Sequence, residues 1–163
     1  AMFFSKSSTY IYSVDINSAT RDAVFNYASA PAYWPFCHPS SVEVKQVEGQ
    51  PPIDLKKSLP LNKQVIEITQ LFYLQQTITW TCTASDPGAT FTIEGSAFGA
   101  KGKITYMFED NPDGSVKFTR IFDLTATNIL TIIGFVLLSN FIGRDATKSL
   151  TTVMSMFELP PTT

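Results

Sequence analysis

His38, Tyr106 and Arg120 are the side chains of this sequence best suited to acid–base chemistry. His38 is the only histidine, and histidine is the residue type whose ordinary pKa lies nearest neutral pH, so it is the first candidate for a general acid or base. Tyr106 could donate a phenolic hydrogen bond to a bound carbonyl group. Arg120 could hold an anion or a carbonyl oxygen, or could instead pair with a carboxylate such as Glu94. We predict catalytic roles for His38, Tyr106 and Arg120.

Several other polar residues are weaker candidates, and His38 itself has a structural alternative. A histidine in a proline-rich loop is commonly solvated or held in a structural hydrogen bond. Asp123 and Glu67 lie on expected strands whose register cannot be assigned from their pattern. Cys37 is next to His38 in sequence, and because adjacent side chains seldom point together, we do not expect a cysteine nucleophile.

The residue inventory argues against several classes of site and partner. One histidine and two distant cysteines cannot supply a zinc site, so we predict no metal. The chain lacks a phosphate-binding glycine loop, a serine-hydrolase elbow and a dinucleotide fingerprint, so we predict no cofactor. The net charge of −2 and the pI of about 5.3 provide no basic surface for nucleic acid.

Alternating polar and apolar residues predict a chain made mainly of β-strands, and prolines predict two loops in it. Tyr10, Tyr12, Val14 and Ile16 form one apolar face of a strand over 9–16. A short helix should follow, capped by Asn17 or Ser18 and ending before Pro31. Prolines make 30–41 an aromatic loop and 49–63 a second loop, with an uncertain edge strand over 53–57. The remaining strands are expected at 42–48, 64–71, 74–85, 90–98, 102–109 and 116–127, with tight turns at Gly88 and Gly114.

The last helix is expected over 138–158, where apolar residues recur at helical spacing. This stripe would pack on one face of the sheet. The preceding apolar run, 129–142, has fourteen residues, fewer than the roughly 20 needed to span a membrane, so we interpret it as a buried core segment. Membrane contact is the less favoured alternative. The stripe comprises Leu138, Ile142, Ala146, Leu150, Val153, Met156 and Phe157.

Composition sets the broad class of the protein. A chain of 163 residues suffices for one core, so we predict a single domain over 1–163. Hydrophobic residues make up 44% and charged residues 16%, and thirteen Phe provide more aromatic area than a small core requires. Two unrelated cysteines and the lack of a recognisable secretory signal favour a reducing, cytoplasmic location.

The order of these elements, together with several short segments, resembles the START-like superfamily, also called SRPBCC, which includes polyketide cyclases and Bet v 1-like proteins. The resemblance extends over nearly the whole chain and implies an α+β helix-grip fold, in which a curved antiparallel sheet of about seven strands wraps around a long C-terminal helix. None of the segments is a catalytic signature. They are VDINSA at 14–19, WPFCHP at 34–39, TWT at 79–81, FTIEG at 91–95, ITY at 104–106 and FTR at 118–120.

The resemblance implies a cavity between sheet and helix that holds an apolar small molecule. Two functions stay open: a cofactor-independent cyclase, dehydratase or isomerase of natural-product biosynthesis, and a non-catalytic carrier or sensor of a lipid-like ligand. Core filling is the alternative for each aromatic residue taken singly. The oligomeric state, monomer or homodimer, is left open. The predicted ligand-binding residues are Tyr12, Trp34, Trp80, Phe91, Phe108, Phe118, Phe122, Leu138, Ile142 and Leu150.

Overall fold

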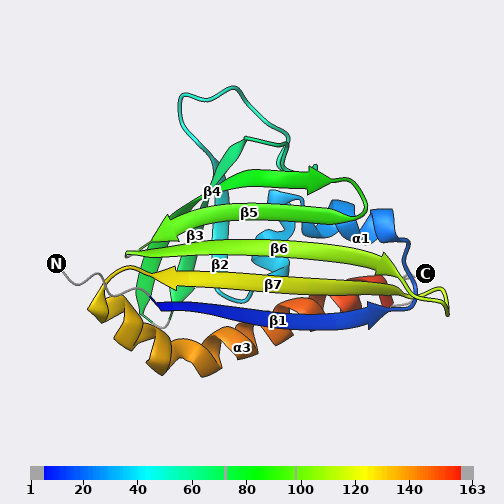
Figure 1. The fold of residues 1–163 in the computed structure, drawn as a ribbon. Helices are drawn as coiled ribbons and strands as arrows, with labels where there is room; N and C mark the ends of the chain where they lie inside the picture. The colour runs from blue at the N-terminus through cyan, green and yellow to red at the C-terminus, as the bar shows by residue number, and fades with distance from the viewer. Residues whose placement is uncertain (1–5, 72, 98, 159–163) are drawn as a thin grey trace.

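The computed structural model describes residues 6–71, 73–97 and 99–158, without the side chains of 71 and 135–141. Its elements follow the predicted order of strand, short helix, loop, six strands and long helix, except that η1 and α2 form in the segment predicted as a loop (Figure 1). They are β1 (Lys6–Ile16), α1 (Arg21–Ala28), η1 (Pro31–Tyr33), α2 (Trp34–Cys37), β2 (Ser41–Gln46), β3 (Gln64–Leu71), β4 (Leu74–Asp86), β5 (Thr90–Ala97), β6 (Ala100–Asp110), β7 (Val116–Ala126) and α3 (Ile129–Glu158).

The described strands form one antiparallel sheet in the order β1-β7-β6-β5-β4-β3-β2. The sheet is strongly curved, so that β2 and β3 run steeply across the direction of β6 and β7 (Figure 1). Gly88 and Gly114 have φ angles of 75° and 87° in the turns that precede β5 and β7, as the turn chemistry predicts. The predicted α+β helix-grip fold is confirmed.

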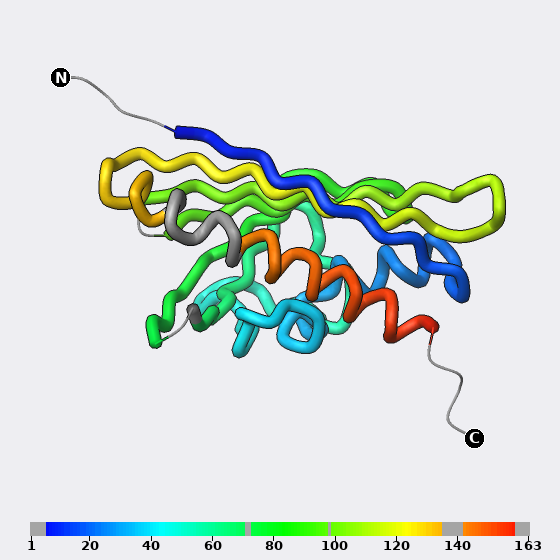
Figure 2. The backbone as a smooth tube through the Cα atoms, turned by 90° about the horizontal axis from the view of Figure 1, so that it is seen from below, coloured from blue at the N-terminus to red at the C-terminus, as the bar shows by residue number. Residues whose placement is uncertain are grey.

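Helix α3 lies along one face of the sheet and contacts β1, β7 and α2 (Figure 2). Ala146, Leu150 and Val153 on its inward side are buried, as the predicted apolar stripe requires. Met156 of that stripe is 52% exposed, so the prediction was wrong at this position, which lies in the last turn of the helix. Among the helices that the structure describes, none has an apolar stretch of the length that a membrane crossing requires.

The start of α3 differs from the prediction, because the helix begins at Ile129 rather than at residue 138. The side-chain oxygen of Asn128 accepts a hydrogen bond of 2.9 Å from the backbone N–H of Thr131, which caps this earlier start. Burial of the whole segment 129–142 was also a wrong expectation. Leu130 is 79% exposed, and Ile129 and Ile133 are exposed as well, because the first turns of α3 lie at the end of the sheet.

The segment between β1 and β2 is more helical than predicted. Thr20, not Asn17 or Ser18, caps α1: its hydroxyl accepts a hydrogen bond of 3.2 Å from the N–H of Ala23. The proline-rich segment forms η1 and α2, because Pro31 and Pro35 occupy first-turn positions, where a missing N–H costs nothing.

The uncertain edge strand at 53–57 is absent from the described structure, in which this segment is loop and turn. The side chain of Gln46 makes the hydrogen bonds to this segment that a neighbouring strand would otherwise make. Its Nε2 donates to the carbonyl oxygen of Ile53 at 2.8 Å, and its Oε1 accepts from the N–H of Ile53 at 3.4 Å. One side chain therefore satisfies the backbone of Ile53 without a second strand.

The core beside α1 is a cluster of phenylalanine rings. Phe108 and Phe118, on β6 and β7, stack with their centroids 5.0 Å apart. Phe25 of α1 packs edge-on against Phe108 at 5.4 Å and against Phe91 of β5 at 6.5 Å. These rings close one end of the space between sheet and helices.

Candidate functional site

A cavity of about 580 Å³ lies between the sheet and α3. Its mouth is marked by Leu74, at the start of β4, and Leu130, at the start of α3, which both line the cavity and are 70% and 79% exposed. Most of the wall is apolar. The apolar lining residues include Trp34, Ile78, Trp80, Ile93, Ile104, Phe122, Leu124 and Ile142.

Two glycines make room for the large rings of this wall. Gly95 on β5 and Gly102 on β6 are partners in the strand register, and both line the cavity. A Cβ atom at Gly95 would lie 2.8 Å from a ring carbon of Trp80, and one at Gly102 would lie 3.2 Å from the Phe122 ring. The two rings therefore lie close against the backbone, and side chains at these glycines would push them into the cavity.

The polar end of the cavity, by which we mean His38, Glu67, Tyr106, Arg120 and Asp145, lies between the apolar wall and the phenylalanine core. The strand register places it there. Along β6 and β7 the pair Tyr106 and Arg120 comes between the cavity pair Ile104 and Phe122 and the core pair Phe108 and Phe118.

His38 joins the sheet to α3 through both of its ring nitrogens. Nε2 lies 3.0 Å from the hydroxyl oxygen of Tyr106, and Nδ1 lies 3.2 Å from Oγ of Ser149. Burial, followed by the nearby charge of Arg120, lowers the pKa of His38 well below its usual range, so the imidazole is neutral near neutral pH. Burial raises the pKa of Tyr106, so its phenol stays protonated.

A neutral imidazole permits two arrangements of this hydrogen-bonded chain. In one tautomer the Tyr106 hydroxyl donates to Nε2 of His38, and Nδ1–H donates to the hydroxyl oxygen of Ser149. In the other, Ser149 donates to Nδ1 and Nε2–H donates to the Tyr106 oxygen, which leaves the phenolic hydrogen free for a molecule in the cavity.

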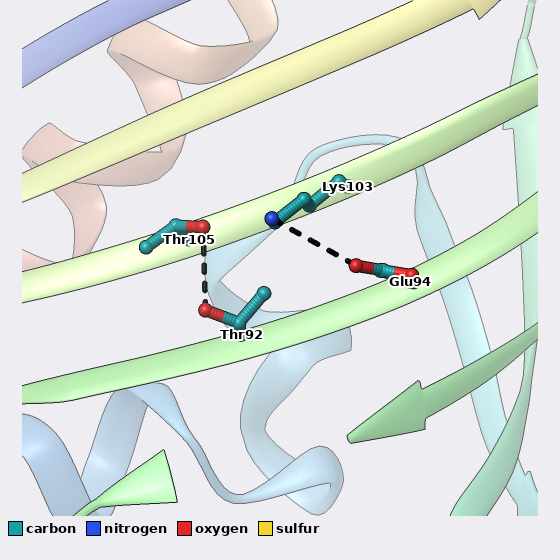
Figure 3. Close-up of polar contacts among 4 residues, drawn as sticks. All are labelled: Thr92, Glu94, Lys103 and Thr105. Carbon is teal, nitrogen blue, oxygen red and sulfur yellow. Dashed lines mark hydrogen bonds and ion pairs between the residues drawn. The ribbon is translucent and has the colours of Figure 1, made fainter. Parts of the chain in front are cut away.

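Arg120 is a buried cation, only 7% exposed, that no carboxylate in the described ranges contacts as an ion pair. Its Nε has no hydrogen-bond acceptor among the described residues. The alternative that Arg120 pairs with Glu94 was wrong. Glu94 points away from the cavity, because strand alternation puts it opposite Ile93 and Gly95, and its carboxylate pairs with Lys103 at 3.8 Å (Figure 3).

Two carboxyl groups share the polar end with Arg120. Glu67 on β3 accepts a hydrogen bond of 2.7 Å from Nε1 of Trp80. Asp145 on α3 has one oxygen, Oδ1, without a donor among the described residues. Burial raises the pKa of Glu67 and of Asp145, and the charge of Arg120 opposes the rise in both.

The structure brings together seven of the residues proposed from sequence and places the others elsewhere. Phe91, Phe108, Phe118 and Leu150 lie in the core, outside the cavity wall. Tyr12 is partly buried beside Gly143 of α3, also outside the wall. The side chain of Leu138 lies outside the described residues. Those that line the cavity are Trp34, His38, Trp80, Tyr106, Arg120, Phe122 and Ile142.

Two members of the polar end were undervalued from sequence. Glu67 was a weaker candidate and Asp145 was not considered, although both line the cavity. The signal for Asp145 was its helical spacing: it lies three residues after Ile142 and next to Ala146, inside the apolar stripe.

In the described part of the chain, His, Cys, Asp and Glu side chains nowhere gather in a group able to hold a metal ion.

A family model described as "Polyketide cyclase / dehydrase and lipid transport" matches residues 9–155. The chain belongs to this family. A comparison with curated proteins found no match.

Solved structures of this family's architecture are similar to the chain at low sequence identity. The Zhui aromatase/cyclase from a Streptomyces species has a TM-score of 0.73 at 11% identity, with 94% of each chain covered. The di-domain aromatase/cyclase StfQ from the steffimycin biosynthetic pathway has a TM-score of 0.69 at 12% identity, covering 93% of this chain and 51% of that one. Ginseng major latex-like protein 151 from Panax ginseng has a TM-score of 0.61 at 13% identity, covering 94% and 99%. At these identities the likeness shows the shared fold.

Proposed function

We propose that this protein binds an apolar, cyclic or polyketide-like small molecule in the cavity and acts on it as a cofactor-independent cyclase, dehydratase or isomerase. The observation that carries the proposal is the polar end, which places a neutral imidazole, a phenol and a guanidinium without an ion-pair partner among the described residues around one region of an otherwise apolar cavity. Membership of a cyclase and dehydrase family and the similarity to aromatase/cyclase folds support it.

The groups present match what an intramolecular aldol condensation requires. One carbon loses a proton, the resulting enolate bonds to a carbonyl carbon, and the carbonyl oxygen gains that proton and becomes a hydroxyl group. The same carbon then loses a second proton, and the hydroxyl group, once protonated, leaves as water. His38 would exchange protons, while Tyr106 and Arg120 would stabilise the charge that develops on the oxygen. The apolar wall would hold a flexible substrate in the reactive conformation, which can supply much of the rate.

One specific observation favours a second function, that of a non-catalytic carrier or sensor. Both nitrogens of His38 already have partners, Tyr106 and Ser149, so neither is free to accept a proton from a ligand without rearrangement. This arrangement suits a purely structural histidine and a carrier or sensor of a lipid-like ligand.

Binding is tested first, with the neutral fluorophore 1-aminoanthracene. We expect saturable binding at one site per chain with micromolar affinity, and displacement by a bulky cyclic metabolite but not by nucleotides. If no neutral apolar probe binds saturably, the binding proposal is wrong.

Turnover then separates the two functions. A linear oligo-β-ketone thioester is incubated with the protein, and ring formation is followed by absorbance and mass spectrometry. For an enzyme, His38→Ala, Arg120→Ala or Tyr106→Phe should lower turnover by about 10²-fold for whichever residue moves a proton or stabilises charge, with probe affinity changed by less than about tenfold. Full recovery of the unchanged thioester, with Arg120→Ala affecting affinity alone, would establish the carrier.

A further inference from the structure

Arg120 lines the cavity and has an unused hydrogen-bond donor. A guanidinium has five N–H donors, and the Nε–H of Arg120 finds no acceptor among the described residues although the residue is 7% exposed. Buried donors are nearly always paired, because an unpaired one loses its hydration without compensation. An acceptor oxygen on a bound molecule would satisfy this group.

Asp145 presents the opposite requirement. Among the described residues its buried Oδ1 has no donor, although Ser40 hydrogen-bonds to this carboxyl group, and Asp145 lines the same cavity from α3. An ionised carboxylate only accepts hydrogen bonds. A hydroxyl group on the bound molecule would supply the missing donor.

The charges of the residues at the polar end determine whether a ligand with a neutral acceptor oxygen or one with an anionic oxygen binds better there. Arg120 is the single cation among its five residues, since His38 is neutral, and both Glu67 and Asp145 lie within range of that cation; Lys148 of α3 also acts on Asp145. A ligand carboxylate would be a third acidic group around one guanidinium. In a buried site such like-charge crowding is expensive.

We propose that the cavity selects a neutral ligand whose polar end carries a carbonyl oxygen beside a hydroxyl group, bound by Arg120 and Asp145, and that it discriminates against carboxylic acids of the same shape. This inference rests on the proposed function only in requiring that the cavity bind a small molecule. The ligand lies with its oxygenated end at the polar end and its apolar rings against Trp80 and Phe122.

Two naphthalene derivatives test the selection because they differ in one group. 1-Hydroxy-2-acetonaphthone carries a ketone beside the hydroxyl, and 1-hydroxy-2-naphthoic acid carries a carboxylate at the same position. Their affinities are measured by displacement of 1-aminoanthracene near neutral pH. We expect the ketone to bind at least about tenfold more tightly than the acid, and more tightly than 2-acetonaphthone, which lacks the hydroxyl.

Substitutions at the polar end test whether its residues cause the preference for the ketone over the acid. Glu67→Gln and Asp145→Asn should each reduce the preference for the ketone over the acid by about tenfold, because each removes an acidic group from the polar end. Glu94→Gln is the matched control: it makes the same change on the opposite face of the sheet, where Glu94 pairs with Lys103 (Figure 3), and should leave the preference unchanged.

The outcomes separate this inference from the proposed function. Binding of the fluorophore with equal or tighter binding of the acid overturns the inference and leaves the binding proposal standing. The wild-type comparison alone decides this, so it does not depend on whether any variant folds. Absence of saturable binding by the fluorophore overturns both.

Discussion

The indole Nε1 of Trp80 donates a hydrogen bond of 2.7 Å to Oε2 of Glu67. The two residues lie on neighbouring strands, with Trp80 two pairs along from Glu67 in the register of β3 and β4. Burial raises the pKa of the Glu67 carboxyl, while Ser41, Trp80 and Arg120 oppose that rise. The bond therefore favours the ionised form of this carboxyl group and opposes the effect of burial.

Trp80→Phe should raise the pKa of Glu67, because it removes a donor that stabilises the ionised carboxylate. The pKa is measured from the ¹³C chemical shift of the Glu67 carboxyl carbon during a pH titration. Trp34→Phe is the control, since Nε1 of Trp34 donates to the carbonyl oxygen of Ala28 and not to a carboxylate. An unchanged Glu67 titration in Trp80→Phe would show that this hydrogen bond contributes nothing to its ionisation.

His38→Gln should make the free energy of unfolding less sensitive to acid. In the folded protein the pKa of His38 lies well below 6.5, so below that pH the unfolded chain binds a proton that the folded chain does not. Wild-type stability is therefore lost as pH falls from 6.5 towards the folded pKa, at up to about 1.4 kcal/mol per pH unit.

The measurement is urea unfolding of both proteins at a series of pH values. The difference between them is the quantity to follow, because Glu67 and Asp145 act in the opposite direction. Their raised pKa values add stability as pH falls, equally in wild type and variant. Parallel pH profiles for the two proteins would contradict the assignment of a neutral, buried His38.

The thiol of Cys37 should be unreactive in the folded protein. It is 2% exposed, and burial raises its pKa to about 12, with Arg120 only partly opposing the rise. Cys82 is also buried, with its pKa raised by burial. We expect 5,5′-dithiobis-(2-nitrobenzoic acid) to modify neither cysteine until urea unfolds the chain. An exposed Ser155→Cys thiol provides the positive control, and rapid labelling of Cys37 in native wild type would be the contrary result.

Gly102→Ala should narrow the cavity and weaken binding of bulky ligands. The added methyl would lie 3.2 Å from the Phe122 ring, so the ring must shift. We expect affinity for a three-ring probe to fall by about tenfold, and affinity for a one-ring probe to change much less. Gly134→Ala is the matched control, because Gly134 also lines the cavity but no described side chain or backbone atom lies within 4 Å of its added methyl. Equal losses for both probes would argue against a size effect.

The most predictable property of this chain was which residues of one strand share a face of the sheet. Alternation along β6 and β7 puts Tyr106, Arg120 and Phe122 on one face, because side chains alternate strictly across a strand. The same rule would have excluded Glu94 as a partner of Arg120, since it follows Ile93 directly. What alternation cannot reveal is position along the strand.

The division between cavity and core depends on contacts between elements far apart in sequence. Phe108 and Phe118 share the phase of Tyr106, yet they lie in the core because Phe25 of α1 fills the space beside them. The start of α3 was missed for a different reason. Residues 129–142 are apolar on most sides, so their sequence shows no helical stripe. The role of Asn128 at the start of the helix is visible only in the structure, through its hydrogen bond to Thr131.

The pairing of the first strand with the last has a consequence for the order in which the protein acquires its structure. Ser7 and Thr125 are hydrogen-bonded neighbours although 118 positions separate them in sequence, and β1 also contacts α3. Contacts between such distant segments close a long loop, and this slows folding. During synthesis, β2 to β6 can pair with their sequence neighbours as they emerge, but β1 must wait for β7. The cavity therefore has no complete wall until nearly all of the described chain has been made, and a ligand can stabilise only that final stage.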